Sequence, residues 1–360
     1  MDLSSFTVIR PFIKPLWRFI EDEEVTEIMV NGNGKVFTES RGHLSCHPEI
    51  AINQKSLHTA VTNIAVNLGI DYDEKTSPIL DARLADGSRV AAVLSPCSVD
   101  GITLTIRKFQ SHRWTLDELL KIGAITHEMT DRVRTAILQH QNILISGGTG
   151  TGKTTMLNAL AALLPPDERL IIIEDTAEIQ LNADNLVRFE ARRQQEGISP
   201  VTIRDLLKAT LRHRPDRILL GEIRGGEAFD LLQALNTGHS GSLSTIHANS
   251  ALQALSRFSS CVLQSGVELP YKAIQALIAD SIQYILHIQR RNGRRYASTL
   301  AQVLGYDHAS DRYRTAIICD REYPTSGPGT THIDMTSDLT ALKAGLVALP
   351  TQRLLPLPNE

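Results

Sequence analysis

The chain has 360 residues, of which 42% are hydrophobic, 21% charged and 5% aromatic. This length predicts two domains at roughly 150 residues per domain, and the composition excludes collagen, a coiled coil or disorder as a description of the whole chain. The 37 lysines and arginines nearly balance the 40 aspartates and glutamates, which leaves a formal net charge of −3. No global positive field therefore attracts DNA or anionic lipid, and nucleic-acid binding has to be argued from a local site.

The first 20 residues carry three basic residues and two prolines and lack the pattern of a signal peptide. No uncharged apolar run in the chain approaches the roughly 18 residues of a membrane-spanning helix. Five apolar side chains can line one face of a short helix, which either packs on its own domain or touches a membrane surface: Phe12, Ile13, Leu16, Trp17 and Ile20. Four scattered cysteines are typical of reduced thiols in a cytoplasmic protein: Cys46, Cys97, Cys261 and Cys319.

Residues 1–107 are expected to form an α+β domain. Turn residues separate β-rich segments, which predict strands at residues 26–31, 35–39, 78–84, 89–94 and 102–107. The pair Asp86-Gly87 predicts a hairpin between two of these strands. Apolar residues spaced three and four apart predict one amphipathic helix over residues 54–68.

Residues 108–118 are polar and irregular and predict a linker. Over residues 119–305, compact apolar runs alternate with helical patterns, which predicts a parallel sheet covered by helices. These runs lie at residues 142–146, 170–173, 217–220 and 242–246, and a hairpin around Asn292-Gly293 is expected at the end of the domain. Residues 306–360 hold five of the fifteen prolines and predict a flexible tail, with at most a short helix near residues 338–347.

The sequence GGTGTGKT at residues 147–154 matches the pattern G-x-x-x-x-G-K-[ST], between a predicted strand and a predicted helix. Backbone N–H groups of such a loop surround a phosphate, and the helix N-terminus adds partial positive charge. Lys153 is predicted to reach the β and γ phosphates, and Thr154 to offer its hydroxyl to Mg²⁺. The predicted nucleotide-binding residues are Gly147, Gly148, Thr149, Gly150, Thr151, Gly152, Lys153, Thr154 and Thr155.

Two apolar strands are predicted to end in acidic residues, at the edge where a parallel sheet presents its functional groups. One strand ends in Glu222, which can polarise a water held on Mg²⁺. The other ends in Glu174 and Asp175, and Glu178 follows in the next turn. This acidic cluster predicts either a cation site or a helix cap.

Two further groups of residues leave several interpretations open. His239 and His247 bracket a short predicted strand, which fits a γ-phosphate sensor, a pair of metal ligands or two ordinary core histidines. A basic run fits a subunit contact or a solvated face better than a DNA site: Arg204, Lys208, Arg212, His213, Arg214 and Arg217.

Four segments in order closely resemble the type II/type IV secretion ATPase superfamily, the hexameric traffic ATPases: GGTGTGKTT (147–155), EDTAEI (174–179), LLGEIRGGEAFDLLQALNTGH (219–239) and GSLSTIHANS (241–250). The resemblance covers about residues 25–305. Its amino-terminal part looks like the tight-adherence pilus and type IV secretion branches. It implies an α/β fold, in which a RecA-like P-loop NTPase domain follows a smaller α+β N-terminal domain.

The resemblance implies roles for individual acidic and histidine residues. Glu178 matches the catalytic glutamate of the superfamily, and Glu222 matches its second nucleotide-site acid. Together with Thr154 they would orient the attacking water and hold Mg²⁺. His239 and His247 match the histidine box, in which one histidine senses the γ-phosphate.

The resemblance also implies a mechanical function. Arg89 and Arg107 resemble arginines that this superfamily brings onto the phosphates as its two domains close. We expect the hinge of this motion at the domain boundary, near residues 108–116. The expected protein is a cytoplasmic, Mg²⁺-dependent ATPase that forms a homo-hexamer and is peripheral at the inner membrane. It would bind ATP, act on platform proteins of a pilus or secretion machine, and need no specific nucleic acid. A DNA-translocating motor of a conjugation system and a regulatory scaffold that binds nucleotide without hydrolysis stay open.

Overall fold

Two β-sheets organise the chain in a computed structural model that describes residues 6, 9–40, 42–70, 72–109, 112–192, 194 and 198–321. Residues Met1–Glu322 belong to one unit. No helix in the described ranges is both long and apolar enough to cross a bilayer. All four cysteines have free thiols.

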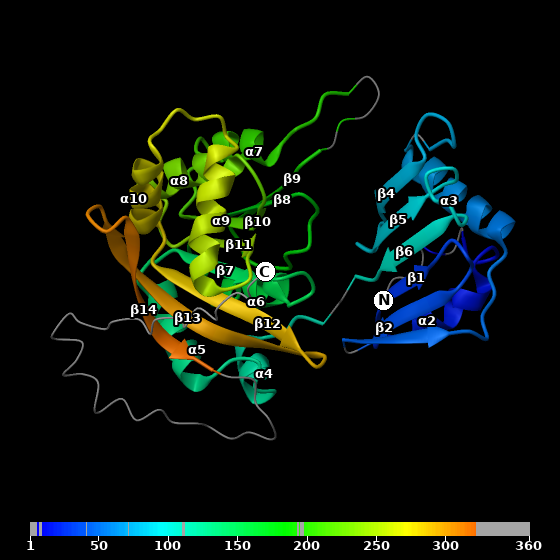
Figure 1. Ribbon diagram of the computed structural model, residues 1–360, viewed down its shortest axis with the longest axis horizontal. Helices are drawn as coiled ribbons and strands as arrows, with labels where there is room; N and C mark the ends of the chain where they lie inside the picture. The colour runs from blue at the N-terminus through cyan, green and yellow to red at the C-terminus, as the bar shows by residue number, and fades with distance from the viewer. Residues whose placement is uncertain are drawn as a thin grey trace, which may run out of the picture. The chain divides into compact units, whose positions relative to one another are not determined.

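The first sheet is antiparallel, with strand order β3-β2-β1-β6-β5-β4 (Figure 1). Its strands are β1 (Val25–Val30), β2 (Val36–Ser40), β3 (His43–His47), β4 (Ile79–Arg83), β5 (Arg89–Val93) and β6 (Thr103–Arg107). The amphipathic helix α3 (Gln54–Leu68) has the bounds that its apolar spacing predicts. It begins where the Asn53 side chain accepts from the Lys55 amide, and it ends at Gly69, whose positive φ closes the last turn.

The apolar side chains of residues 12–20 pack on their own domain, which is one of the two interpretations given for this segment. The segment forms the short helices η1 (Lys14–Leu16) and α2 (Trp17–Glu21). Its apolar side chains join the core beneath the first sheet, and the buried ones are Ile13, Leu16, Trp17, Phe19 and Ile20.

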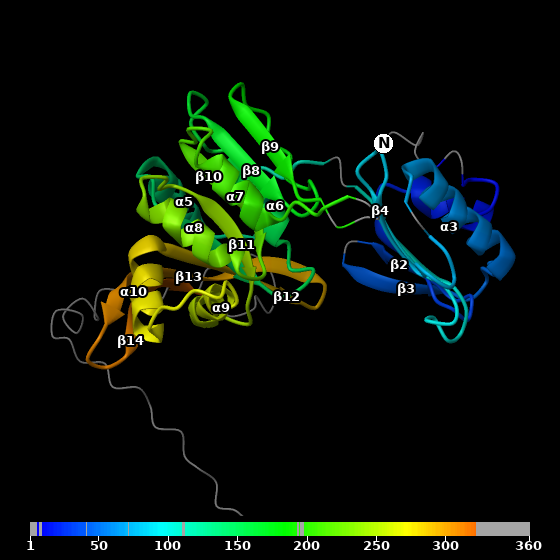
Figure 2. The same cartoon turned by 90° about the horizontal axis from the view of Figure 1, so that it is seen from above.

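The second sheet has the order β14-β13-β12-β7-β11-β10-β8-β9, which can be followed across Figure 2. Strands β12 to β9 in this order are parallel, and β13 and β14 extend the sheet antiparallel. The strands are β7 (Ile143–Gly147), β8 (Leu170–Glu174), β9 (Leu186–Glu190), β10 (Arg217–Ile223), β11 (Leu243–His247), β12 (Tyr284–Arg291), β13 (Arg294–Asp307) and β14 (Arg312–Asp320).

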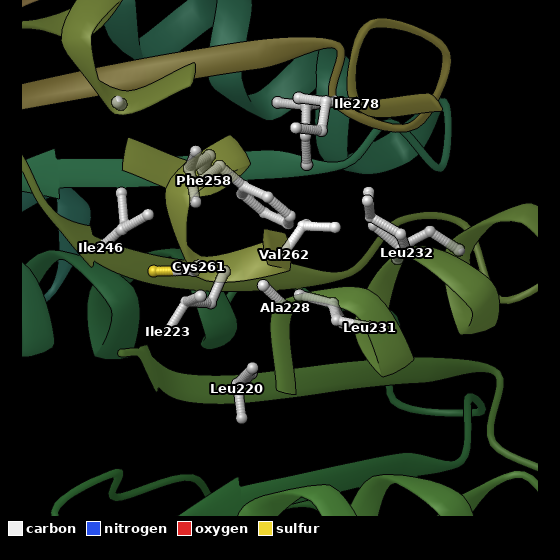
Figure 3. Packing of buried hydrophobic residues seen from close by; sticks show 14 of the residues in the cluster. Leu220, Ile223, Ala228, Leu231, Leu232, Ile246, Phe258, Cys261, Val262 and Ile278 are labelled. Atoms are coloured by element: carbon white, nitrogen blue, oxygen red, sulfur yellow. The ribbon is translucent and has the colours of Figure 1, made fainter. Parts of the chain in front are cut away.

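Helices cover both faces of this sheet, as the alternation of apolar runs and helical patterns predicts. One layer holds α4 (Leu116–Lys121), α5 (His127–Leu138) and α6 (Lys153–Ala161), and the other holds α7 (Ile203–Thr210), α8 (Glu227–Asn236), α9 (Ala251–Leu263) and α10 (Tyr271–Ser281). In β8, Leu170 and Ile172 face the first layer, whereas Ile171 and Ile173 face the second. Figure 3 shows part of the second layer, where Phe258, Cys261 and Val262 of α9 pack against α8 and the strands.

The predicted start of the tail is wrong. The tail is predicted to begin at residue 306, but β13 continues to Asp307, and β14 pairs with it over Arg312–Asp320. β14 is an edge strand whose side chains are half-buried or exposed, so it lacks an apolar pattern. Residues 322–360 of the predicted tail, including the expected helix near residues 338–347, lie outside the described residues.

The predicted linker over residues 108–118 also includes ordered structure at both ends. Helix α4 begins at Leu116, because Thr115 and Glu118 form a reciprocal capping box. At the other end the Lys108 amine is buried and donates to the Phe19 carbonyl at 3.1 Å and the Asp22 carbonyl at 2.5 Å. Lys108 is therefore anchored to the first sheet's domain.

Candidate functional site: a phosphate-binding loop

The phosphate loop connects the buried strand β7 to helix α6. Gly150 and Gly152 have φ values of +68° and +95°, which L side chains rarely adopt. A Cβ at Gly147 would lie 2.5 Å from the Ile288 carbonyl oxygen, so only glycine fits there. No side chain caps α6, whose N-cap residue is Gly152. Its first amide groups are therefore left to bind an anion.

Lys153, the first residue of α6, is only 8% exposed. Its ammonium group donates to the carbonyl oxygens of Gly147 and Gly148, at 3.2 and 3.0 Å. Burial lowers the pKa of this amine, and the carboxylate of Glu222 at 3.9 Å acts in the opposite direction. The Lys153 ammonium group is therefore a positive charge held against the backbone of the phosphate loop.

A cavity opens over this loop at the carboxyl ends of the parallel strands. Residues 149–155 of the loop line it, together with residues from the ends of β8, β10 and β11. Arg89 and Arg107 of the first sheet line the same cavity. Gly148 lines an adjoining cavity with Asn249 and Arg257, among others. The structure thus gathers most of the predicted site residues from both sheets.

Glu178 lies between the phosphate loop and the first sheet. One carboxylate oxygen accepts from Arg89 at 3.0 Å, and the other lies 3.4 Å from the hydroxyl of Thr154. Arg89 also donates to the Thr176 hydroxyl at 2.8 Å. The acid, the hydroxyl and one of the two arginines implied by the resemblance are therefore in contact.

Glu222 and His247 form a second polar group beside Lys153. The Nε2 atom of His247 lies 2.7 Å from a Glu222 carboxylate oxygen, and its Nδ1 atom lies 3.4 Å from the Lys153 amine. Burial and then the Lys153 charge lower the pKa of His247, and the Glu222 carboxylate acts in the opposite direction. The Nε2 atom also lies 3.2 Å from the Lys153 amine, so the ring contacts both the acid and the lysine.

Arg224 belongs to this group, although the sequence argument did not single it out. Its guanidinium binds Glu222 at 2.6 Å and Asp175 at 2.7 Å, and so ties the end of β10 to the end of β8. Residues two apart on a strand share one face. The Glu-Ile-Arg spacing at residues 222–224 was therefore an available signal.

Glu174 binds the backbone of a loop, and because no helix begins there the helix-cap interpretation is wrong for this residue. The side chain is 3% exposed, and one carboxylate oxygen accepts from the amides of Glu178 and Ile179, each at 2.9 Å. Burial is the largest influence on its pKa and raises it to about 7. Glu174 thereby fixes the backbone that carries Glu178.

His239 does not reach the cavity. It precedes β11, whereas His247 ends that strand, and its Nδ1 atom lies 3.1 Å from the Ala234 carbonyl oxygen at the end of α8. Because the four strand residues 243–246, at about 3.3 Å each, lie between the two histidines, the interpretation as a shared metal site is wrong. Among the residues that the structure describes, no group of three His, Cys, Asp or Glu side chains is placed to hold a metal ion.

The basic run is engaged within the molecule at both ends. Arg217 is fully buried, and its guanidinium binds both carboxylate oxygens of Glu168. Arg204 pairs with Asp230 at 2.6 Å. A buried arginine offers nothing to a DNA phosphate, so the run is not a continuous DNA-binding face.

One row of residues crosses the first sheet and faces the second. Strand register aligns Arg83, Arg89, Arg107, Glu27 and Glu39 on neighbouring strands β4, β5, β6, β1 and β2. Outside the cavity, Arg83 pairs with Glu190 of β9 at 3.0 Å, and Glu39 pairs with Arg295 of β13 at 3.0 Å. The two arginines of the cavity lie between these two ion pairs.

Comparison with known proteins identifies the family and the fold of the chain. The model of the family described as "Type II/IV secretion system protein" matches residues 13–325. Conjugal transfer protein TrbB of Rhizobium radiobacter is 36% identical over 299 residues, which cover 82% of this chain and 88% of TrbB. Type IV secretion system protein PtlH of Bordetella pertussis is 36% identical over 307 residues, which cover 78% and 90%. The X-ray structure of the ATPase DotB of Yersinia pseudotuberculosis shares the fold, with a TM-score of 0.58, 15% identity and coverage of 82% and 79%.

Proposed function

Because this chain belongs to the type II/IV secretion system protein family, we propose that it binds ATP with Mg²⁺ and hydrolyses it to ADP and phosphate. The observation that carries the proposal is the single cavity lined by the phosphate loop, Glu178, Glu222, Arg89 and Arg107. A triphosphate needs amide donors, a lysine and further cations around its oxygens, and this cavity offers all three.

The residues fit both ATP and its metal ion. The left-handed Gly150 and Gly152, the uncapped start of α6 and the Lys153 amine form an anion site. The Thr154 hydroxyl and the Glu178 carboxylate, 3.4 Å apart, are oxygen ligands of the kind Mg²⁺ prefers, directly or through water. When bound, Mg²⁺ neutralises charge on the β and γ phosphates.

The acidic residues and arginines supply the remaining chemistry. Glu178 orients the attacking water and accepts its proton, while Arg89 and Arg107 stabilise the charge that develops on the transferred phosphoryl group. Glu222 pairs with the Nε2 atom of His247 at 2.7 Å, and this ring, which lies beside Lys153, senses the γ-phosphate. The position of His239 supports no such role for that residue.

The same proposal includes the biological setting. The chain forms a homo-hexameric ring on the cytoplasmic face of the inner membrane, attached through platform proteins, and ATP hydrolysis moves its first sheet relative to its second. The names of the relatives favour a type IV secretion or conjugal transfer machine. The description of TrbB as a conjugal transfer protein also favours one second candidate function for this chain, a motor that translocates DNA.

Phosphate release by the purified protein tests the enzyme proposal. Wild-type protein with ATP and Mg²⁺ should release phosphate, whereas Lys153→Ala should neither bind nor hydrolyse ATP, and Glu178→Gln should bind ATP without hydrolysing it. Wild-type release no higher than that of Lys153→Ala would refute hydrolysis. ATP binding without release in the wild type would instead identify a regulatory scaffold. Light scattering after size-exclusion chromatography tests the hexamer.

A further inference from the structure

The hairpin formed by β12 and β13 reaches both the phosphate loop and the first sheet. Arg295 donates through Nε to the Gly150 carbonyl at 2.8 Å and through Nη2 to Glu39 at 3.0 Å. Gly150 lies inside the phosphate loop, and Glu39 lies on β2 of the first sheet. One guanidinium group therefore connects two parts of the molecule that are far apart in sequence.

The surroundings of Glu39 indicate a built contact. Its side chain is 15% exposed, and it also pairs with Arg290 at 3.2 Å. Arg290 donates in turn to the Gly42 carbonyl in the turn after β2. A Cβ at Gly42 would lie 2.6 Å from the Gly293 carbonyl oxygen, so the two turns touch where neither carries a side chain. Of the two arginines, only Arg295 hydrogen-bonds the phosphate loop.

We propose that Arg295 is a positioning residue that couples the conformation of the phosphate loop to the position of the first sheet, through Glu39. Any motion that moves Glu39 away from β13 removes the partner that orients the guanidinium, and the hydrogen bond to Gly150 weakens with it. Glu39 follows Arg107 and Glu27 in the row across the sheet. Movement of the phosphate-facing arginines is therefore accompanied by movement of the phosphate loop itself.

The proposal rests on nucleotide binding at this loop, and a double-mutant cycle with the fluorescent nucleotide mant-ADP separates the two claims. Arg295→Gln and Glu39→Gln should each weaken mant-ADP binding roughly fivefold, and the double variant should bind no more weakly than the worse single variant. Both side chains lie at a solvent-accessible contact rather than in a core, so all three variants should fold, which circular dichroism checks.

The ion pair between Arg83 and Glu190 is a matched control. It joins the same sheet to β9 at 3.0 Å and, within the described residues, neither partner hydrogen-bonds the phosphate loop. The variants Arg83→Gln and Glu190→Gln should change mant-ADP affinity less than twofold and show no coupling. Arg295→Lys adds a geometric test, because one ammonium group cannot hold two partners in the directions of the guanidinium fork. It should bind mant-ADP as weakly as Arg295→Gln.

Amide hydrogen exchange gives the reciprocal readout, since coupling between two sites acts in both directions. Binding of mant-ADP should slow exchange in β2 (Val36–Ser40) of the wild type and leave it unchanged in Arg295→Gln. Additive effects in the cycle, equal coupling in the control pair, or full affinity in Arg295→Lys would each overturn the proposal. A wild type that fails to bind mant-ADP would overturn nucleotide binding itself.

Discussion

Arg89 contacts two groups near the phosphate loop, the carboxylate of Glu178 and the hydroxyl of Thr176. Its neighbour in register, Arg107, lines the same cavity and lies 3.7 Å from Glu27. The resemblance implied phosphate contacts for both arginines, and their common register on β5 and β6 is a physical reason to expect that they act together. A group that stabilises charge developing in the transition state affects turnover more than ground-state binding.

Replacing Arg89 with glutamine should therefore lower kcat for ATP hydrolysis by roughly 100-fold or more, while mant-ADP affinity stays within about threefold. Arg83→Gln, one strand further along the same row, is the control and should keep near-wild-type kcat. Steady-state phosphate release and fluorescence titration measure the two quantities. Equal losses in affinity and turnover would mean that Arg89 binds nucleotide without acting on the transition state.

Glu174 gives the stability of the protein a distinctive dependence on pH. Burial raises its pKa from 4.5 to about 7 in the folded protein. Between these two values the folded state binds a proton that the unfolded state has released, so the free energy of unfolding falls as the pH rises, and the cost is fully present above pH 7. This sign is opposite to that of a salt-bridged carboxylate.

The variant Glu174→Gln removes this cost and keeps an oxygen that accepts the amides of Glu178 and Ile179. Its stability relative to wild type should grow by roughly 1–2 kcal/mol between about pH 5.5 and pH 8. Urea unfolding at both pH values checks this. A stability difference that does not change with pH would show that Glu174 is ionised in the folded state.

At the scale of secondary-structure elements, β10 shows that an arginine from a basic stretch of sequence can be buried in the core. Arg217 begins this strand, is fully buried, and donates to Glu168 and to the carbonyl oxygens of Ile137 and Gly241. Its guanidinium therefore connects α5 and the segments before β8 and β11. The linear pattern grouped it with solvent-exposed cations because sequence spacing carries no information about burial.

Arg217→Ala should lower the free energy of unfolding by roughly 3–5 kcal/mol, because it leaves Glu168 and two carbonyl groups without their donor. Arg212→Ala, an exposed member of the same basic run, should change it by less than about 0.5 kcal/mol. Chemical denaturation of both variants measures the difference. Equal, small effects would show that the buried ion pair contributes little to stability.

Elements with a clear apolar period were predicted well, and elements without one were missed. The helix over residues 54–68, the hairpin around Asp86-Gly87 and the strand that enters the phosphate loop are confirmed. β3 (His43–His47) and β14 were missed because their side chains are mostly exposed or half-buried. Both are edge strands, held by pairing with a neighbour rather than by an apolar face.

At the scale of the whole molecule, the ion pairs described between the sheets all start from one row of the first sheet. A rigid row moves as a unit, so a change at one end reaches Arg89, Arg107 and Glu39 together. The buried Lys108 holds the end of β6 to α2, and α4 begins at Leu116. The hinge proposed near residues 108–116 therefore lies between these two anchors, Lys108 and Leu116.

Net charge favours the motor that needs no DNA. The net charge of −3 supplies no global positive field, and two arginines of the basic run, Arg204 and Arg217, are engaged in ion pairs, which disfavours DNA binding. Added duplex DNA should change phosphate release by less than about twofold at low salt. Strong stimulation that disappears steeply as salt increases would favour the DNA-translocating motor instead.

The sequence by itself predicted the phosphate loop, the acidic residues at the ends of strands, the helices and strands with a clear apolar period, and the family. These features are local or periodic, so that short segments carry them. Only the tertiary structure decided which residues meet. In the folded chain Arg89 contacts Glu178, and Arg224 contacts Glu222 at the site, whereas His239 lies outside the cavity. Arg217 is buried, and Glu174 binds the backbone of a loop. Arg295 connects Glu39 to the phosphate loop. These contacts depend on strand order, register and burial, which bring together residues as much as 256 positions apart.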